Sequence, residues 1–379
     1  MSKSVLTSEP LKGTPKLNWF MIIFLSLSLA GLISLAFLGL TAGVIGFVAY
    51  NRIQPELTSR NLALQPAISE VKLGWSQQPI LEKDQQNWLI LGVDSLESRG
   101  NVPPLTDTML LAGVRPKSAS VNLLSLPRDL WLDDVKTKIN SLYAYGIDQN
   151  PAQPTQLVTQ TLSRNLALPI HKTLIVTLTQ LEQVIDILGG VEIDVPVGFT
   201  DTLFPRPDVD VKTVRDPKLL YETITFTPGS QKMSGSLALK YIRSRHSGDL
   251  AGTDLARGDR QQLVVESLIK QLADVTLYKQ NPVIILDLWE WYQLNFQSQI
   301  GIAELVSLFK PMIQAKQFKP MIIKEQLTVA KMDKWTGQFI EPGVIYNPVV
   351  KSSQYLGQWV YLPTDTKKFQ NYIYQKIYQ

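Results

Sequence analysis

The stretch WLILGVDSLESRGNVPPLTDTMLLAGVRPKSASVNLLSLPRD, residues 88–129, decides the fold. It holds three apolar runs, at 88–93, 108–114 and 120–126, separated by polar and proline-containing turns. Short apolar runs bounded by turn residues are typical of buried β-strands. Because consecutive strands most often lie beside each other, we expect the three to run up, down and up as neighbours in one sheet.

This arrangement brings three charged residues to one edge of the sheet. Asp94 ends the first strand, Asp107 begins the second, and Arg128 follows the third. Two carboxylates beside an arginine suit Mg²⁺ that holds a phosphate-bearing ligand, because Mg²⁺ takes a few carboxylates and completes its shell with substrate oxygens. The alternative is that the aspartates are ordinary turn residues at strand ends.

A second charged stretch is KYIRSRHSGDLAGTDLARGDRQQ, residues 240–262. Residues 241–245 read as extended chain, in which side chains two apart point the same way, so Arg243 and Arg245 are predicted to project together. Guanidinium groups match phosphate oxygens, and this pair suits a dense anion. A solvated basic loop with surface ion pairs is the alternative.

After a loop that contains Gly248 and Gly252, Asp254 is expected to cap a helix that continues to about residue 276. Asp254, Arg257 and Gln261 share one side of it, and Arg260 lies close by. Further along, the same side becomes apolar. That apolar surface, with residues 174–188, suits either ordinary core packing or a slot for the hydrocarbon part of a ligand.

Composition excludes several classes of protein. The 379 residues are 45% hydrophobic and 18% charged, with a net charge of +4, so the chain is neither disordered nor a strongly basic nucleic-acid binder. It has no cysteine, which excludes disulfides, zinc-thiolate sites and a cysteine nucleophile. Its two histidines are too few for a multi-histidine metal site.

The N-terminal region predicts a membrane anchor. Residues 17–50 carry no charged side chain and exceed the ~20 apolar residues that span a bilayer, whereas a cleavable signal has a shorter apolar core. More positive charge precedes this segment than immediately follows it, so residues 1–16 are expected in the cytoplasm and the rest outside the plasma membrane. Residues 51–85 are expected to form a stalk or linker.

The remaining chain alternates strands and helices, which predicts a mixed α/β sandwich with a central sheet flanked by helices. We expect a catalytic domain over 86–330 and a C-terminal extension, 331–379, packed on it. Residues 198–220 read as a surface loop, and residues 367–378 as an amphipathic helix.

Six runs in order resemble the LytR-CpsA-Psr family of membrane-anchored cell-envelope enzymes. They cover about residues 86–275 and follow a predicted single membrane helix. The runs are LILGVD ending at Asp94, TDTML around Asp107, LLSLPRD with Arg128, KIN from Lys138 followed by YAYG, LGGV at 188–191, and YIRSR at 241–245 followed by Asp254, Arg257, Arg260 and Gln261. Residues 198–222 have no clear counterpart in the family, and the segment 246–253 is longer than usual.

The resemblance implies a transferase that moves a glycopolymer from a polyprenyl-pyrophosphate carrier to peptidoglycan by Mg²⁺-assisted phosphotransfer. It implies that Asp94 and Asp107 hold the metal, and that these two and Arg128 are the catalytic residues. It also implies a set of pyrophosphate-binding residues: Arg128, Arg243, Arg245, Arg257, Arg260, Gln261 and Lys138. The implied partners are the lipid-linked glycan, peptidoglycan and the membrane, with no nucleic acid.

Two other functions fit the same residues: a polyprenyl-pyrophosphate phosphatase and a non-catalytic isoprenoid-lipid-binding envelope protein. A transcription regulator is disfavoured by the predicted membrane helix and by the lack of a strongly basic face. The residues identify no general base, since Asp129 is a candidate that can equally pair with an arginine.

Overall fold

The computed structural model describes residues 54–60, 64–93, 104–206, 209, 214, 216–246, 252–314, 320–333, 335–348 and 353–379. The predicted membrane segment 17–50 and the predicted metal ligand Asp94 lie outside these ranges. Within them, no helix has both the length and the apolar character needed to cross a membrane.

A five-stranded mixed sheet forms the centre, in the order β11–β3–β2–β1–β6. The strands are β1 (Gln86–Val93), β2 (Thr106–Arg115), β3 (Ser120–Ser125), β6 (Lys172–Thr177) and β11 (Met321–Glu325). β2 pairs antiparallel with both β1 and β3, which confirms the predicted up, down and up arrangement. β6 and β11 run parallel to β1 and β3 at the two edges of the sheet.

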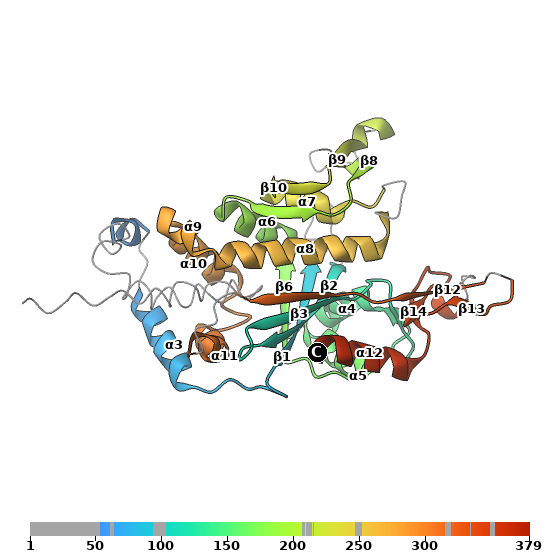
Figure 1. Ribbon diagram of the computed structural model, residues 1–379, viewed down its shortest axis with the longest axis horizontal. Coiled ribbons are helices and arrows are strands. Elements are labelled where there is room, and N and C mark those ends of the chain that lie inside the picture. Colours follow the sequence, from blue (N-terminus) through green and yellow to red (C-terminus); the bar gives the residue numbers. More distant parts are fainter. Residues whose placement is uncertain are drawn as a thin grey trace, which may run out of the picture.

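Both faces of the sheet are covered, because its strands alternate between two apolar clusters. Trp88 and Ile90 belong to one cluster, and Leu89 and Leu91 to the other. The helices packed in the first cluster are α3 (Leu64–Ser76), α6 (Leu178–Ile187), α7 (Gly235–Arg243), α8 (Asp254–Ala273), α10 (Ile284–Asn295) and α11 (Ile302–Gln314). Those in the second are α4 (Leu142–Gln149), α5 (Gln156–Leu166) and α12 (Thr366–Tyr378). The result is the expected mixed α/β sandwich (Figure 1).

Two ribbons pack in the same apolar cluster as α6, α7 and α8. β7 (Val191–Val195) pairs with β10 (Gly229–Met233), and β8 (Phe199–Pro205) with β9 (Tyr221–Phe226). The prediction of a loop over 198–220 is therefore wrong for β8. Burial alternates along β8, and Phe199 stacks on Tyr241 of α7 with ring centroids 5.9 Å apart, so packing against α7 holds this segment extended.

The predicted extended run 241–245 is also wrong in its first half, because residues 235–243 form α7. Ser234 caps this helix, its Oγ accepting the N–H of Leu237, and Ala238, Tyr241 and Ile242 are buried at helical spacing. The chain becomes extended only after Arg243. Likewise α8 is capped by Thr253 rather than Asp254, since Thr253 Oγ1 accepts the N–H of Ala256.

The C-terminal part adds a small sheet, in the order β13–β12–β14–β15. Its strands are β12 (Val329–Met332), β13 (Phe339–Glu341), β14 (Ile345–Tyr346) and β15 (Leu362–Pro363). It lies near a ribbon of β4 (Trp131–Leu132) and β5 (Thr137–Lys138), because Tyr361 bridges to Leu130. α12 is the predicted amphipathic helix and buries Phe369, Ile373 and Ile377.

Candidate functional site

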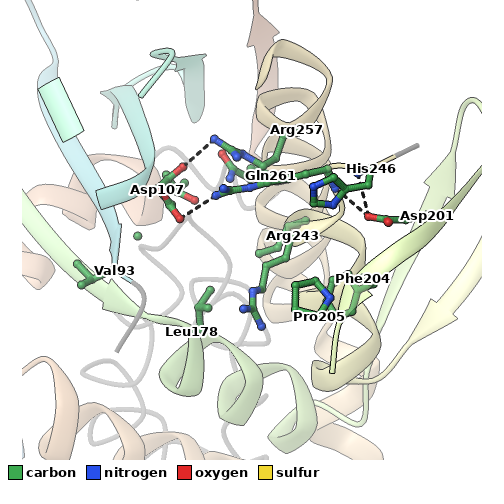
Figure 2. A pocket seen from close by; sticks show the side chains of 14 residues that line it. Val93, Asp107, Leu178, Asp201, Phe204, Pro205, Arg243, His246, Arg257 and Gln261 are labelled. Carbon is green, nitrogen blue, oxygen red and sulfur yellow. Dashed lines mark hydrogen bonds and ion pairs between the residues drawn. The ribbon is translucent and has the colours of Figure 1, made fainter. Parts of the chain in front are cut away.

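Asp107 is the acidic centre of a pocket at the edge of the sheet. Arg128 Nη1 donates to its Oδ1 atom at 2.6 Å, and Arg245 Nη2 donates to its Oδ2 atom at 2.8 Å. Arg257 Nη2 donates to the backbone carbonyl of Asp107 at 3.4 Å (Figure 2). The structure thus confirms that Asp107 and Arg128 converge at one edge, and it brings two further arginines to them.

Arg245 is held by a residue that sequence reasoning assigned no role. The Oδ2 atom of Asp201 accepts the backbone N–H of Arg245 at 2.9 Å and that of His246 at 3.1 Å. Its Oδ1 atom accepts the N–H of Leu203 at 3.0 Å, and Asp201 is fully buried. The sequence did contain a signal for this role. Asp201 follows Phe199 by two residues, so in a strand it points to the same side as this apolar ring, where an acidic side chain needs hydrogen-bond donors.

The first turn of α8 supplies Arg257, and it lies very close to β3. A Cβ atom at Gly258 would stand only 2.5 Å from Ser125 Oγ, so the lack of a side chain there lets the helix approach the strand. Arg257 Nη2 is 2.8 Å from Asp254 Oδ1, three residues earlier, as expected for one helix side.

Three buried polar atoms in this cluster have no hydrogen-bond partner among the described residues: Arg257 Nη1, Arg128 Nε and Asp254 Oδ2. Arg128 Nε lies 3.6 Å from Asp129 Oδ2 and 3.7 Å from Asp254 Oδ2, too far for good hydrogen bonds. A buried donor left without an acceptor costs roughly 1–3 kcal/mol. Of the two arginines, only Arg257 lines the pocket, and a ligand with several anionic oxygens would supply an acceptor for its Nη1 atom.

Arg243 and Gln261 complete the polar side of the pocket. Arg243 lines it together with Leu178 and Pro205, and its guanidinium carbon is 5.8 Å from the ring centre of Phe204 (Figure 2). Of the charged residues lining the pocket, three are arginines and two are aspartates, and one of these aspartates, Asp201, binds backbone amides. The pocket therefore favours an anion.

Gln261 also lines a second, apolar pocket that continues from the first. The two share Gly92, Thr108, Leu178, Ile242 and Gln261. The second pocket is otherwise lined mainly by apolar side chains of β1, β2, β6, α6, α8 and α10: Ile90, Leu110, Val176, Leu181, Val184, Val264, Val265, Leu268, Leu272 and Trp291. The charged pocket thus opens directly onto an apolar slot.

Three predicted pyrophosphate ligands do not line the pocket: Arg128, Arg260 and Lys138. Arg128 reaches it only through its ion pair with Asp107. Arg260 is buried, and it donates through Nε to the carbonyl of Tyr241 at 2.8 Å and through Nη2 to that of Ser244 at 2.6 Å. It therefore holds the end of α7. Lys138 pairs with Asp129 instead, because its Nζ atom donates to Asp129 Oδ1 at 2.7 Å.

The ionisation of the cluster follows from burial and charge together. Burial by itself would raise the pKa of Asp107, but the charges of Arg245 and Arg128 outweigh it and hold this pKa below its ordinary value of 3.8. Burial lowers the pKa of Arg257 to about 10, although Asp254 opposes the change. Burial also raises the pKa of Asp254, against the charges of Arg257 and Arg128. At neutral pH the arginines remain cationic and Asp107 anionic.

Asp107 suits a magnesium ligand in chemistry. It stays ionised, it lines the anion pocket, and each of its oxygens keeps a lone pair beyond the one guanidinium bond that it accepts. No group of three acidic or histidine side chains within the described residues is placed to bind a metal. Mg²⁺ needs no such group where substrate phosphates and water fill the remaining positions.

The sequence profile of the LytR_cpsA_psr family matches residues 57–340. TagU of Oceanobacillus iheyensis, a polyisoprenyl-teichoic acid–peptidoglycan teichoic acid transferase, is 28% identical over 248 residues, covering 65% of this chain and 69% of TagU. TagV of Bacillus subtilis, with the same activity in its name, is 27% identical over 234 residues, covering 60% of this chain and 53% of TagV.

Solved structures share the fold at low sequence identity. The crystal structure of Bacillus subtilis TagV superposes with a TM-score of 0.51 at 20% identity, covering 78% of this chain and 98% of that one. The crystal structure of protein gbs0355 from Streptococcus agalactiae gives a TM-score of 0.50 at 18% identity, covering 78% and 88%. The mixed α/β sandwich is therefore the architecture of these proteins too.

Proposed function

Since the chain belongs to the LytR-CpsA-Psr family, we propose that it transfers a glycopolymer from a polyprenyl-pyrophosphate carrier to peptidoglycan. The relatives TagU and TagV carry this transfer of teichoic acid in their names. The single observation that supports it most is the junction of an arginine-lined pocket with an apolar slot. A lipid diphosphate has the same two parts in the same order.

The diphosphate group sits between Arg245, Arg257, Arg243 and Gln261 in this proposal. Guanidinium groups bind phosphate oxygens through charge-assisted hydrogen bonds, which are roughly twice as strong as neutral ones. The buried Nη1 atom of Arg257, which has no acceptor in the described part of the chain, gains one from the ligand. Arg128 acts through Asp107, which it holds at 2.6 Å.

The isoprenoid chain enters the slot between α6 and α8. Its walls are aliphatic side chains, and each buried CH₂ group of a lipid contributes about 0.8 kcal/mol. Leu178 and Ile242 line both pockets, so the first isoprene unit meets hydrocarbon directly after the diphosphate.

Asp107, with Asp94 as the second expected ligand, is the residue that would hold Mg²⁺. When bound, this ion neutralises phosphate charge and polarises a phosphoryl oxygen. Arg128 and Arg245 orient the Asp107 carboxylate toward the pocket by holding one oxygen each.

In the transfer, a hydroxyl oxygen of peptidoglycan attacks the phosphorus next to the glycopolymer. The bond from that phosphorus to the bridging oxygen breaks, and polyprenyl phosphate leaves with the electron pair. Arg245 and Arg257 stabilise the charge on the leaving oxygens, as phosphoryl transfer requires positioning and charge neutralisation rather than a protein nucleophile. We assign the acceptance of the hydroxyl proton to Asp254, because its Oδ1 atom lies 2.8 Å from Arg257 of the pocket and its Oδ2 atom has no hydrogen-bond partner among the described residues.

The reaction takes place outside the plasma membrane, with residues 17–50 as the single membrane helix and residues 1–16 in the cytoplasm. The apolar length of this segment and its positive N-terminal flank support that topology. Protease added to intact spheroplasts should cut the region after residue 51, and protection of that region would contradict the topology.

A transfer assay with the full chain tests the function. Labelled lipid-linked glycopolymer, peptidoglycan and Mg²⁺ should give a wall-linked product that carries the label. Arg245→Ala should reduce the rate by about 10²–10³-fold, the usual loss for one donor that stabilises transition-state charge. Arg164→Ala is a matched control, because Arg164 pairs with Asp134 on the exposed face of α5. Release of phosphate or free polymer without wall-linked product would favour a phosphatase, and lipid binding without turnover would favour a non-catalytic carrier protein.

A further inference from the structure

The mouth of the charged pocket is formed by two residues that the proposed transfer has not used. Among the described residues that line this pocket, only Pro205 and His246 are exposed to solvent. Arg257 and Gln261, which are 4% and 6% exposed, form its floor. A ligand that is held at the floor and continues into solvent therefore passes Pro205 and His246.

Asp201 fixes both sides of this mouth. Its Oδ2 atom accepts the backbone N–H of His246 at 3.1 Å, and its Oδ1 atom accepts that of Leu203, two residues before Pro205, at 3.0 Å. The register of β8 with β9 shifts between Asp201 and Phe204, and a bulge of this kind changes the direction of the side chains that follow it. Phe204 is buried, and Pro205 after it is exposed at the pocket. Two segments that are far apart in the chain are thus held together by one carboxylate.

We propose that Pro205 and His246 bind the first sugar of the donor glycan, the sugar that is esterified to the diphosphate. This inference rests on the proposed transfer and adds the subsite that recognises the glycan end of the donor. A sugar ring presents C–H groups on its faces and hydroxyl groups at its edge. The pyrrolidine ring of Pro205 offers van der Waals contact to the C–H groups. The imidazole of His246 has two ring nitrogens that can hydrogen-bond the hydroxyl groups.

The parts of the donor follow one another in the same order as the residues that line the two pockets. The isoprenoid chain occupies the apolar slot, whose lining includes neither Pro205 nor His246. The diphosphate lies among the arginines, and His246 directly follows Arg245 in the chain. Pro205 directly follows Phe204, whose ring centre is 5.8 Å from the guanidinium carbon of Arg243 (Figure 2). The sugar that comes next after the phosphate therefore meets the two residues of the mouth.

The geometry of the transfer assigns this mouth to the donor rather than to the acceptor. The donor sugar stays bonded to the attacked phosphorus, whereas the acceptor hydroxyl approaches in line with the leaving oxygen, so the two sugars need separate places. Arg257 Nη2 is 2.8 Å from Asp254 Oδ1, the group assigned to the hydroxyl proton, and 3.4 Å from the carbonyl oxygen of Asp107. The acceptor is therefore expected on the Asp107 side. Figure 2 shows Pro205 and His246 on the other side of the pocket.

Both residues lie where the sequence departs from the family. Pro205 belongs to residues 198–222, which have no clear counterpart, and His246 begins the segment 246–253, which is longer than usual. The arginines of the pocket lie within the runs that resemble the family. A shared set of phosphate ligands beside a mouth that is particular to this chain is the arrangement expected of a subsite that selects the donor glycan.

Binding of two lipids to the full chain in detergent tests this subsite. One probe is polyprenyl pyrophosphate, and the other carries a single N-acetylglucosamine on its terminal phosphate. The parent should bind the sugar-bearing probe more tightly. His246→Ala should raise the Kd for that probe about fivefold to tenfold, the effect of one or two lost hydrogen bonds, and should leave the Kd for the bare probe unchanged. His246→Gln keeps a donor and an acceptor and should therefore lose less affinity.

Pro205→Ala examines the other side of the mouth. It should raise the Kd for the sugar-bearing probe about twofold to threefold, because part of the apolar ring surface is lost, and it should leave the Kd for the bare probe unchanged. Thr223→Ala is the matched control, because Thr223 is exposed on β9 and is not among the described residues that line the pocket. This control should bind both probes as the parent does.

A parental Kd for the sugar-bearing probe in every variant of His246 and Pro205 that keeps the parental melting temperature would overturn the inference. Equal losses for both probes would also overturn it, because the two residues would then act on the diphosphate. So would a loss confined to the binding of soluble peptidoglycan strands, which would assign the mouth to the acceptor. If the parent binds both probes equally, the sugar subsite does not exist and the proposed function stands. If the parent binds neither probe, the proposed function itself fails.

Discussion

Asp201 fixes the backbone of Arg245, 44 positions later in the chain, through a 2.9 Å hydrogen bond from the Arg245 amide to its carboxylate. Arg245 in turn reaches Asp107 at 2.8 Å. A fully buried acid on the small β8–β9 ribbon therefore positions a guanidinium at the edge of the central sheet.

Asp201→Ala should reduce both stability and lipid-diphosphate affinity. The change leaves the amide donors of Leu203, Arg245 and His246 without their acceptor, at a cost of roughly 1–3 kcal/mol for each donor that water does not reach. Thermal unfolding and the Kd for polyprenyl pyrophosphate check this expectation. Asp201→Asn keeps one acceptor oxygen, so its melting temperature and its Kd should fall between those of the parent and of Asp201→Ala. A variant with parental melting temperature and affinity would show that Asp201 does not position Arg245.

Asp107→Asn should separate metal binding from anion binding. The amide keeps the shape of the side chain but removes the negative charge that Mg²⁺ needs, and it frees Arg128 and Arg245 for phosphate oxygens. Transfer should fall by at least about 100-fold. The Kd for polyprenyl pyrophosphate measured without Mg²⁺ should stay the same or become tighter. Weaker metal-free binding would indicate that Asp107 acts mainly by orienting the arginines.

The acid stability of the chain should depend on Asp107. Because its pKa is lowered in the folded state, its ion pairs stabilise the fold fully above its ordinary pKa of 3.8, and the contribution is lost as pH falls through the lower, folded value. Melting temperatures measured from neutral to acidic pH should therefore drop more steeply below pH 3.8 for the parent than for Asp107→Asn. If the melting temperatures of the parent and of Asp107→Asn fall in parallel in this pH range, the ion pairs of Asp107 do not stabilise the fold.

Leu181→Phe should make binding depend on lipid length. Leu181 lines only the apolar slot, not the charged pocket, so a larger ring there narrows the space for isoprene units. Overpacking of this kind typically costs about 1–3 kcal/mol. We expect a higher Kd for long polyprenyl pyrophosphates and an unchanged Kd for a short one such as isopentenyl pyrophosphate. An equal loss of affinity for the long and the short pyrophosphate would show that the isoprenoid chain does not occupy this slot.

Arg260→Gln should lower stability without weakening lipid-diphosphate binding by the folded protein. Arg260 is 4% exposed, and its guanidinium binds the carbonyls at the end of α7 and lies 4.8 Å from the ring centre of Phe199. Calorimetry should show a lower melting temperature. A large rise in the Kd at a temperature where the variant is fully folded would return Arg260 to the set of ligands expected from the sequence.

Much of the central sheet could be predicted because its signals are local. The apolar runs before Asp94, after Asp107 and before Arg128 each have the length of a strand, and strands that follow one another usually pair. The expected pairing alone predicted that Asp107 and Arg128 lie at one edge of the sheet. In the structure Arg128 Nη1 is 2.6 Å from Asp107 Oδ1. Helical spacing also predicted the charged first turn of α8 and the apolar side that continues from it.

The sequence by itself determined that three consecutive strands form the middle of the sheet and that acidic and guanidinium groups gather at its edge. Strand length, alternation and helical spacing are properties of neighbouring residues. Only the tertiary structure decided which charged groups face the pocket. Arg243 ends a helix rather than sharing a strand with Arg245, Arg260 turns inward to backbone carbonyls, and Asp201 holds a segment far along the chain. These outcomes depend on which buried donors and acceptors meet across distant segments, and the spacing of residues along the chain does not carry that information.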